Sequence, residues 1–206
     1  EYLPFTVDNF DASLARIRDS GADAVLVSLV GGSSVTFNKA FASFGLADKA
    51  LRLGTLIEEN TLAGIGAANA KNLYSSAGYF ANITTPAAKA FADAYAKRFG
   101  PQAPALNGLA ESAYEGFLML EAIAKKAGSL DVAKLDAASE GVSYSGPRGA
   151  VTMKARHVEQ DVYLADVDDK GFRVVNTVRE AEATVRAGRE TLRTTESSVL
   201  LEGVTT

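Results

Sequence analysis

Residues 51–91 constrain the fold most, because strand-like and helix-like runs alternate within this one segment. Residues 51–57 have the apolar character of a buried strand, and two carboxylates, Glu58 and Glu59, follow directly. A second strand is predicted over residues 73–80. Ligands of open α/β sheets bind beyond the carboxyl ends of the strands, so charges at such an end indicate either a ligand contact or a helix cap.

The same alternation extends over the first hundred residues. Residues 24–30, AVLVSLV, form a continuous apolar run of strand length, as expected for a parallel strand that helices cover on both faces. Thr85 followed by Pro86 is a favoured helix start, because the threonine side chain caps the first turn and proline has no N–H to leave unpaired. Repeated β-α units of this kind predict an α/β fold with an open parallel sheet flanked by helices.

The pattern changes in the second half of the chain. Residues 105–127 predict a long helix that is apolar around most of its girth, so we expect it to be largely buried. Turn signals at residues 145–147 and 168–171 separate strand-like runs, which predicts an antiparallel return. Residues 176–206 are polar with apolar positions at roughly heptad spacing, and we expect a helical tail or linker there.

The composition excludes several classes of function. The 206 residues include no cysteine and one histidine, His157, so disulfides, thiolate nucleophiles and clustered-histidine zinc sites are ruled out. The formal net charge is −4 and no basic stripe stands out, which argues against nucleic acid as a partner. No cofactor fingerprint is present, and no apolar run approaches the length of a membrane span.

A family resemblance rests on several short stretches that occur in a fixed order. They are residues 21–25 with 30–32, residues 56–60, residues 78–80 with 85–86, residues 111–115 with 127–128, and the turn at residues 146–149. Together they make residues 2–175 similar to the later part of type I periplasmic binding proteins. Within that family the chain most resembles the amide, urea and branched-chain amino-acid receptors of ABC transporters.

The resemblance implies two parallel-sheet lobes with helices on both faces, joined by crossing strands, with the ligand in the cleft between them. Residues 1–78 would belong to the second lobe and residues 79–140 to the first lobe, after a crossing strand. Residues 141–175 would form the hinge return and the closing strands, before a tail of residues 176–206. Only the later portion of the family pattern is matched, so we expect an upstream segment or a second chain to complete the fold.

The first candidate site is the segment formed by Val30, Gly31, Gly32 and Ser33. Glycines between a strand and a helix let backbone N–H groups approach a ligand, and a helix N-terminus favours a carboxylate or carbonyl oxygen. In the family that the chain resembles, this segment faces the cleft. The competing interpretation is a tight turn with a serine cap.

The second candidate site is formed by Glu58, Glu59 and Asn60, with Tyr79 and Phe80 close by. The resemblance implies that an acidic residue in this loop holds a ligand ammonium, but the residues leave open which glutamate does so. The other glutamate would then be a helix-terminal charge. The two aromatic residues either wall the pocket or pack at the hinge.

These features predict a protein that captures a small amide, urea or amino acid for an ABC importer, in the periplasm or another extracytoplasmic space, with the transporter permease as its partner. A ligand-sensing, cytoplasmic regulator of amide metabolism on the same fold is the first alternative. An α/β enzyme is the second, and the absence of a nucleophile–base pair argues against it. We therefore predict no catalytic residue, no metal and no cofactor.

Overall fold

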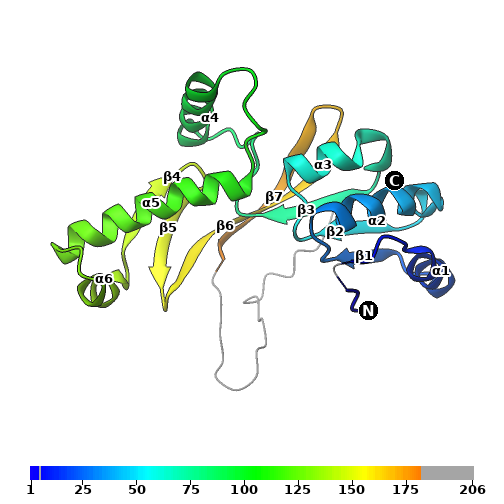
Figure 1. The fold of residues 1–206 in the computed structure, drawn as a ribbon, viewed down its shortest axis with the longest axis horizontal. Helices are drawn as coiled ribbons and strands as arrows, with labels where there is room; N and C mark the ends of the chain where they lie inside the picture. The colour runs from blue at the N-terminus through cyan, green and yellow to red at the C-terminus, as the bar shows by residue number, and fades with distance from the viewer. Residues whose placement is uncertain (5, 182–206) are drawn as a thin grey trace.

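The computed structural model describes residues 1–4 and 6–181, and within them helices and strands alternate as far as α4 (Figure 1). The helices are α1 Asp11–Ser20, α2 Gly31–Ser43, α3 Glu59–Ile65, α4 Pro86–Phe99, α5 Gly108–Ala127 and α6 Val132–Ser139, with short 3-10 turns η1 Leu46–Asp48 and η2 Ala67–Asn69. The strands are β1 Ala24–Val27, β2 Leu51–Gly54, β3 Leu73–Ala77, β4 Ser143–Gly146, β5 Gly149–Lys154, β6 His157–Asp168 and β7 Gly171–Ala181.

The strands are joined in the order β1-β2-β3-β6-β5-β4, and β7 pairs with the other edge of β6. The first three strands are parallel, and the strands from β4 onward are antiparallel to their neighbours. The predicted α/β class and the predicted antiparallel return are both confirmed. Helices α1 to α3 lie at one end of the molecule with β1 to β3, and α5 and α6 lie at the other end with β4 and β5 (Figure 1).

The long strand β6 connects the two ends. Its residues 163–166 pair with β3, and its residues 157–159 pair with β5. The chain itself passes from the first end to the second after β3, through the segment that contains Tyr79 and Phe80. This arrangement is compatible with the predicted division into lobes at residue 78, which stays a prediction.

The parallel strands are shorter than the apolar runs predicted. Strand β1 ends at Val27 rather than at residue 30, and β2 ends at Gly54 rather than at residue 57. The chain turns back after Gly54, so that Ile57 occupies the space above it; a Cβ on Gly54 would lie 2.5 Å from the Ile57 side chain. Ile57 is apolar because it belongs to the core, not because it continues the strand.

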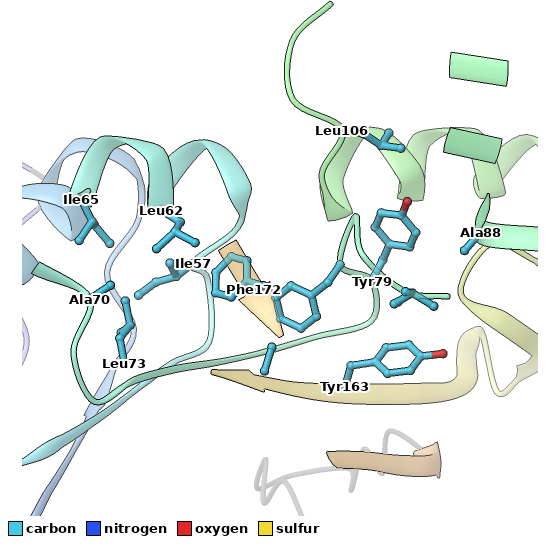
Figure 2. Packing of buried hydrophobic residues seen from close by; sticks show 13 residues of the cluster. Ile57, Leu62, Ile65, Ala70, Leu73, Tyr79, Ala88, Leu106, Tyr163 and Phe172 are labelled. Carbon is cyan, nitrogen blue, oxygen red and sulfur yellow. The ribbon is translucent and has the colours of Figure 1, made fainter. Parts of the chain in front are cut away.

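The largest core cluster joins α3, β3, β6 and β7 with the segment after β3. Figure 2 shows Ile57, Leu62 and Ile65 on one side of this cluster, with Tyr79 and Tyr163 on the other and Phe172 between them. A separate cluster lies between α1, α2 and β1. Its buried members include Phe10, Leu14, Phe37 and Phe41.

The prediction of a helical tail from residue 176 is wrong for residues 176–181, because β7 continues to Ala181. The apolar residue Val178 pairs with Val162 of β6. Its position in the apparent heptad therefore reflects pairing between β7 and β6 and not a helix. The remainder of the predicted tail, residues 182–206, lies outside the described residues.

The prediction that the long helix is buried around its girth is also wrong. In α5 the residues that face β4 and β5 are Glu111, Glu115, Met119 and Ile123, spaced four apart on one stripe. Apolar residues on the other sides of α5 are exposed to solvent, and Phe117 among them is 73% exposed. The buried stripe is set by ionic contacts at one end of the helix, which hydrophobicity patterns do not detect.

Strand β2 carries a fully buried arginine, Arg52, whose guanidinium donates to carbonyl oxygens rather than to a carboxylate. Its Nη1 donates to Asn38 Oδ1 at 2.8 Å, and its Nη2 donates to the carbonyls of Asn69 and Lys71 at 2.9 and 2.7 Å. The guanidinium also stacks 4.7 Å above the Phe41 ring. Burial lowers the pKa of Arg52 to about 10, so it is charged at neutral pH. Arg52 thus ties α2 and η2 to the sheet.

We expect Arg52→Met to lower the free energy of unfolding by about 3 kcal/mol, because several buried acceptors lose a charged donor. Urea unfolding followed by circular dichroism measures this. Arg173→Met is the matched control, since Arg173 pairs with Asp166 on the exposed face of the same sheet. Its effect should be much smaller. Equal effects of the two substitutions would show that the buried contacts contribute little.

Candidate functional site

The loops that follow β1 and β2 lie side by side at one edge of the sheet. The backbone N–H of Thr55 donates to the carbonyl of Val27 at 3.2 Å. The hydroxyls of Ser28 and Thr55 are 3.1 Å apart and form a hydrogen bond. Because both strands run in the same direction, helices α2 and α3 also begin at this edge. The fold therefore brings the two candidate segments to the same edge of the sheet.

Val30 to Ser33 do not form the tight turn considered as an alternative, because α2 begins at Gly31. Val30 is the N-cap residue and is about half exposed, and within the described residues no side chain caps this helix. The Ser33 hydroxyl instead donates to the Val7 carbonyl at 3.3 Å. Gly31 has a φ of 58°, a conformation that favours glycine. The N–H groups of the first turn of α2 thus have no side-chain acceptor among the described residues.

Glu58 is the N-cap of α3. Its Oε2 accepts from the backbone and side-chain nitrogens of Asn60 at 2.9 and 3.2 Å, and its Oε1 accepts from the backbone N–H and hydroxyl of Thr61 at 2.8 and 2.7 Å. Partial burial acts to raise the pKa of Glu58, but these hydrogen bonds outweigh it and the pKa falls below its ordinary value. Glu58 therefore fits the predicted helix-terminal charge.

Glu59 points in a different direction, toward the segment that follows β3. Its Oε1 accepts from the Ala81 backbone N–H at 2.7 Å, and its Oε2 is buried without a hydrogen-bond partner among the described residues. Burial raises the pKa of Glu59. It also borders a cavity of about 370 Å³ shared with Ala81, Asn82 and the β6–β7 turn. Glu59 thus holds the segment after β3 against α3.

Tyr79 and Phe80 are both buried, which agrees with packing at the crossing point rather than with an open pocket wall. The Phe80 ring lies 4.7 Å from that of Phe172, and the Tyr79 ring meets the edge of Phe91 at 6.4 Å. Figure 2 shows the Tyr79 hydroxyl directed toward Leu106, and this oxygen has no partner in the part of the chain that the structure describes. Burial, with the charges of nearby glutamates, raises the pKa of Tyr79 to about 12.

The predicted site residues are therefore neighbours at one sheet edge but do not line one cavity. Val30 and Ser33 border a cavity of about 640 Å³ that runs along β1. Glu59 borders the smaller cavity by the β6–β7 turn. Whether any of these residues contacts a ligand stays a prediction.

One charged cluster was missed by sequence reasoning. Arg148, in the turn between β4 and β5, is bound by two buried carboxylates of α5, Glu111 and Glu115. Gln160 of β6 and Tyr144 of β4 complete these contacts. Two glutamates four residues apart in the mostly apolar first half of this helix were the available signal. We call these five residues the Arg148 cluster. His157, by contrast, lies exposed at a turn, 2.9 Å from the Ala155 carbonyl.

Residues 1–172 match the family model described as periplasmic binding protein. The chain belongs to this family. A curated relative, Leu/Ile/Val-binding protein homolog 6 of Brucella melitensis, is 30% identical over 172 residues, which is 80% of this chain and 44% of the relative. The family and the α/β fold class predicted from the sequence are confirmed, and the chain covers a portion of the full fold.

Two solved structures from Rhodopseudomonas palustris show the same fold. One, from strain HaA2, is an ABC transporter solute-binding protein in complex with p-hydroxybenzoic acid; it is 28% identical, has a TM-score of 0.77, and covers 86% of this chain and 51% of its own. The other, a solute-binding protein in complex with 4-hydroxybenzoate, is 27% identical, has a TM-score of 0.78, and covers 87% and 51%. The chain thus spans about half the length of the relatives that it matches.

Two further properties concern only residues 1–4 and 6–181. Their helices include none that combines the length and the apolar character needed to cross a membrane. The same residues hold no group of three or more histidine, cysteine, aspartate or glutamate side chains placed to bind a metal ion.

Proposed function

We propose that this chain is part of a solute-binding protein that captures a small carboxylate-bearing solute and delivers it to the permease of an ABC importer, in the periplasm or another extracytoplasmic space. The open N-terminus of α2 carries the proposal. The first-turn N–H groups of a thirteen-residue helix, Gly31–Ser43, stand at the edge of the sheet where ligands of open α/β sheets bind. The solutes named for the relatives, amino acids and hydroxybenzoates, all carry a carboxylate.

The two neighbouring helices differ in how their N-termini are satisfied. Glu58 already supplies a carboxylate to α3, whereas α2 has no side-chain cap among the described residues. A solute carboxylate at α2 would supply the missing acceptor and meet the positive end of the helix dipole. A neutral amide or urea offers the same acceptor geometry without the charge, so we expect it to bind more weakly.

An aromatic acid fits this site better than a zwitterionic amino acid. A carboxylate has about four acceptor positions, and those of Glu58 already receive four N–H and O–H donors from Asn60 and Thr61. The free oxygen of Glu59 is buried, and its other oxygen accepts from the Ala81 N–H. Neither glutamate therefore offers an open acceptor for a ligand ammonium in this arrangement.

The exposed apolar face of α5 indicates where the remaining half of the fold would lie. Leu109 is 76% exposed, and Phe117, Leu120 and Leu130 border a cavity of about 630 Å³. Strand β4 ends the sheet order with an unpaired edge among the described strands. We assign the α5 surface to the first lobe, residues 79–140, and the β4 edge to the hinge return and closing strands, residues 141–175, with a further segment or a second chain covering them.

Titration of the ¹⁵N-labelled chain, followed by backbone amide NMR shifts, tests the proposed function. We expect 4-hydroxybenzoate, and more weakly leucine, to shift the signals of Gly31, Gly32 and Ser33 in a saturable way without turnover. Their amides, and urea, should produce smaller shifts. Equal shifts with acid and amide would contradict a carboxylate site, and turnover would favour an enzyme.

A pair of glycine substitutions locates the site. Gly32→Val places a branched side chain in open space at the start of α2, and we expect it to weaken acid binding about tenfold or more, that is by about 1.4 kcal/mol. Gly116→Val makes the same change in open space on α5 and is the matched control. If both variants bind like the unmodified chain, the α2 N-terminus is not the site.

A further inference from the structure

Two buried carboxylates in the Arg148 cluster share a single guanidinium. Glu111 is 0% exposed and Glu115 is 2% exposed, and they lie one turn apart on α5. Arg148 Nη2 pairs with Glu111 Oε2, and Arg148 Nε lies 2.9 Å from Glu115 Oε2. With both carboxylates ionised, these three side chains carry one uncompensated negative charge in the interior.

Within residues 1–4 and 6–181, the other side chains in contact with these three are neutral. They are Ser112 of α5, Tyr144 of β4, Gln160 and Tyr163 of β6, and Tyr79 of the segment after β3. Tyr144 donates to Glu115 Oε2 at 2.7 Å, which satisfies the carboxylate without neutralising it. Asp161 and Arg179, which lie beside Tyr163, are 3.4 Å from each other and so form their own pair. None of these named groups supplies a second positive charge to the cluster.

The cluster is tightly enclosed at the junction between the two ends of the molecule. A Cβ on Gly146 would lie 2.4 Å from Glu115 Oε1, and a Cβ on Gly78 would lie 2.7 Å from Gln160 Nε2. Gly78 begins the crossing segment after β3, and Gln160 belongs to the strand that spans both ends. The close fit leaves little room to solvate the excess charge, so a bound proton is the remaining way to neutralise it.

We propose that Glu111 and Glu115 share one proton in the folded chain, which makes the Arg148 cluster a proton-linked contact between α5 and the crossing strands. This inference is independent of the proposed function, because it concerns the junction and not the α2 edge. Burial and the neighbouring carboxylate of Glu115 raise the pKa of Glu111 to about 8, against the opposing effect of Arg148. The proton would thus remain bound at neutral pH.

The direction of the pH effect follows from linkage. The ordinary pKa of a glutamate is 4.5, so between about pH 5 and pH 8 the folded chain holds one proton more than the unfolded chain. The resulting stabilisation is complete below the unfolded-state pKa of 4.5, and it is lost as the pH rises through the folded-state pKa of about 8. Alkaline conditions should therefore loosen the contact between α5 and β6.

Urea unfolding of the full 206-residue chain between pH 5.5 and pH 8 tests this inference. We compare the equilibrium constant for unfolding of the unmodified chain with that of Glu111→Gln at each pH. Their ratio should rise by about tenfold for each unit of increase in pH over the steep part of this range. Glu121→Gln is the control on the same helix. Glu121 is exposed and pairs with Lys125, which lowers its pKa, so Glu121 does not titrate between pH 5.5 and pH 8. This variant should follow the unmodified chain. Parallel curves for the unmodified chain and Glu111→Gln would overturn the proposal.

Proton uptake on refolding covers the case in which Glu111→Gln does not fold. Refolding the unmodified chain in weakly buffered solution at pH 6.5 should take up about one proton more than the Glu115→Gln chain, in which Glu111 faces Arg148 without a second carboxylate. If Glu115→Gln also fails to fold, an uptake well below one proton by the unmodified chain overturns the proposal. The same uptake with and without Glu115 would overturn it as well.

Discussion

Arg148→Met is expected to lower the free energy of unfolding by about 4 kcal/mol at neutral pH, because it leaves Glu111 and Glu115 buried without their cation. The loss should be smaller at pH 5.5, where protons can neutralise the two carboxylates. Methionine has similar length to the aliphatic part of arginine, so loss of packing contributes little. Urea unfolding at the two pH values measures both effects.

The control for this prediction is Arg156→Met. Arg156 pairs with Asp136 at 2.7 Å on the surface, where both side chains are more than half exposed. Such a pair stabilises by less than about 1 kcal/mol. If Arg148→Met costs no more than Arg156→Met, the Arg148 cluster is not an important part of the interior.

Phe80→Ala should lower the free energy of unfolding by about 4 kcal/mol, because the Phe80 side chain is fully buried and its removal leaves a cavity beside Phe172. The substitution should leave the shifts that acids induce at the start of α2 unchanged in direction, since Phe80 belongs to the core and not to the open edge. Thermal unfolding and the NMR titration provide the two measurements.

Phe99→Ala is the matched control for Phe80→Ala. Phe99 is the last residue of α4 and is more than half exposed, so its replacement should change stability by about 0.5 kcal/mol or less. A Phe80→Ala chain that keeps its stability but loses its response to acids would place Phe80 at the ligand site, in line with the pocket-wall interpretation of the sequence.

The sequence by itself determined the class of fold and the main elements. Apolar runs separated by helical periodicity predicted the parallel strands, and Thr85 with Pro86 predicted the start of α4, where the Thr85 hydroxyl accepts from the Ala88 N–H at 3.1 Å. Turn signals predicted the antiparallel strands of the second half. These features are local, because caps, turns and periodicity depend on residues close together in the chain.

Only the tertiary structure decided what each candidate side chain contacts within the fold. Glu58 and Glu59 are adjacent and chemically identical, yet one caps α3 and the other holds Ala81, because the α3 backbone directs them differently. Phe80 looked equally suited to a pocket wall and to a core until its contact with Phe172 was known. Such roles depend on partners far away in the chain.

The same reason explains the errors for α5 and β7. An apolar helix interrupted by Glu111 and Glu115 buries its glutamates because Arg148, more than thirty residues later, folds back onto them. Residues 176–181 form a strand because β6 offers them an edge to pair with. Hydrophobic patterning records how apolar each position is, but the direction in which an element faces is set by the distant charges and strand edges that it meets.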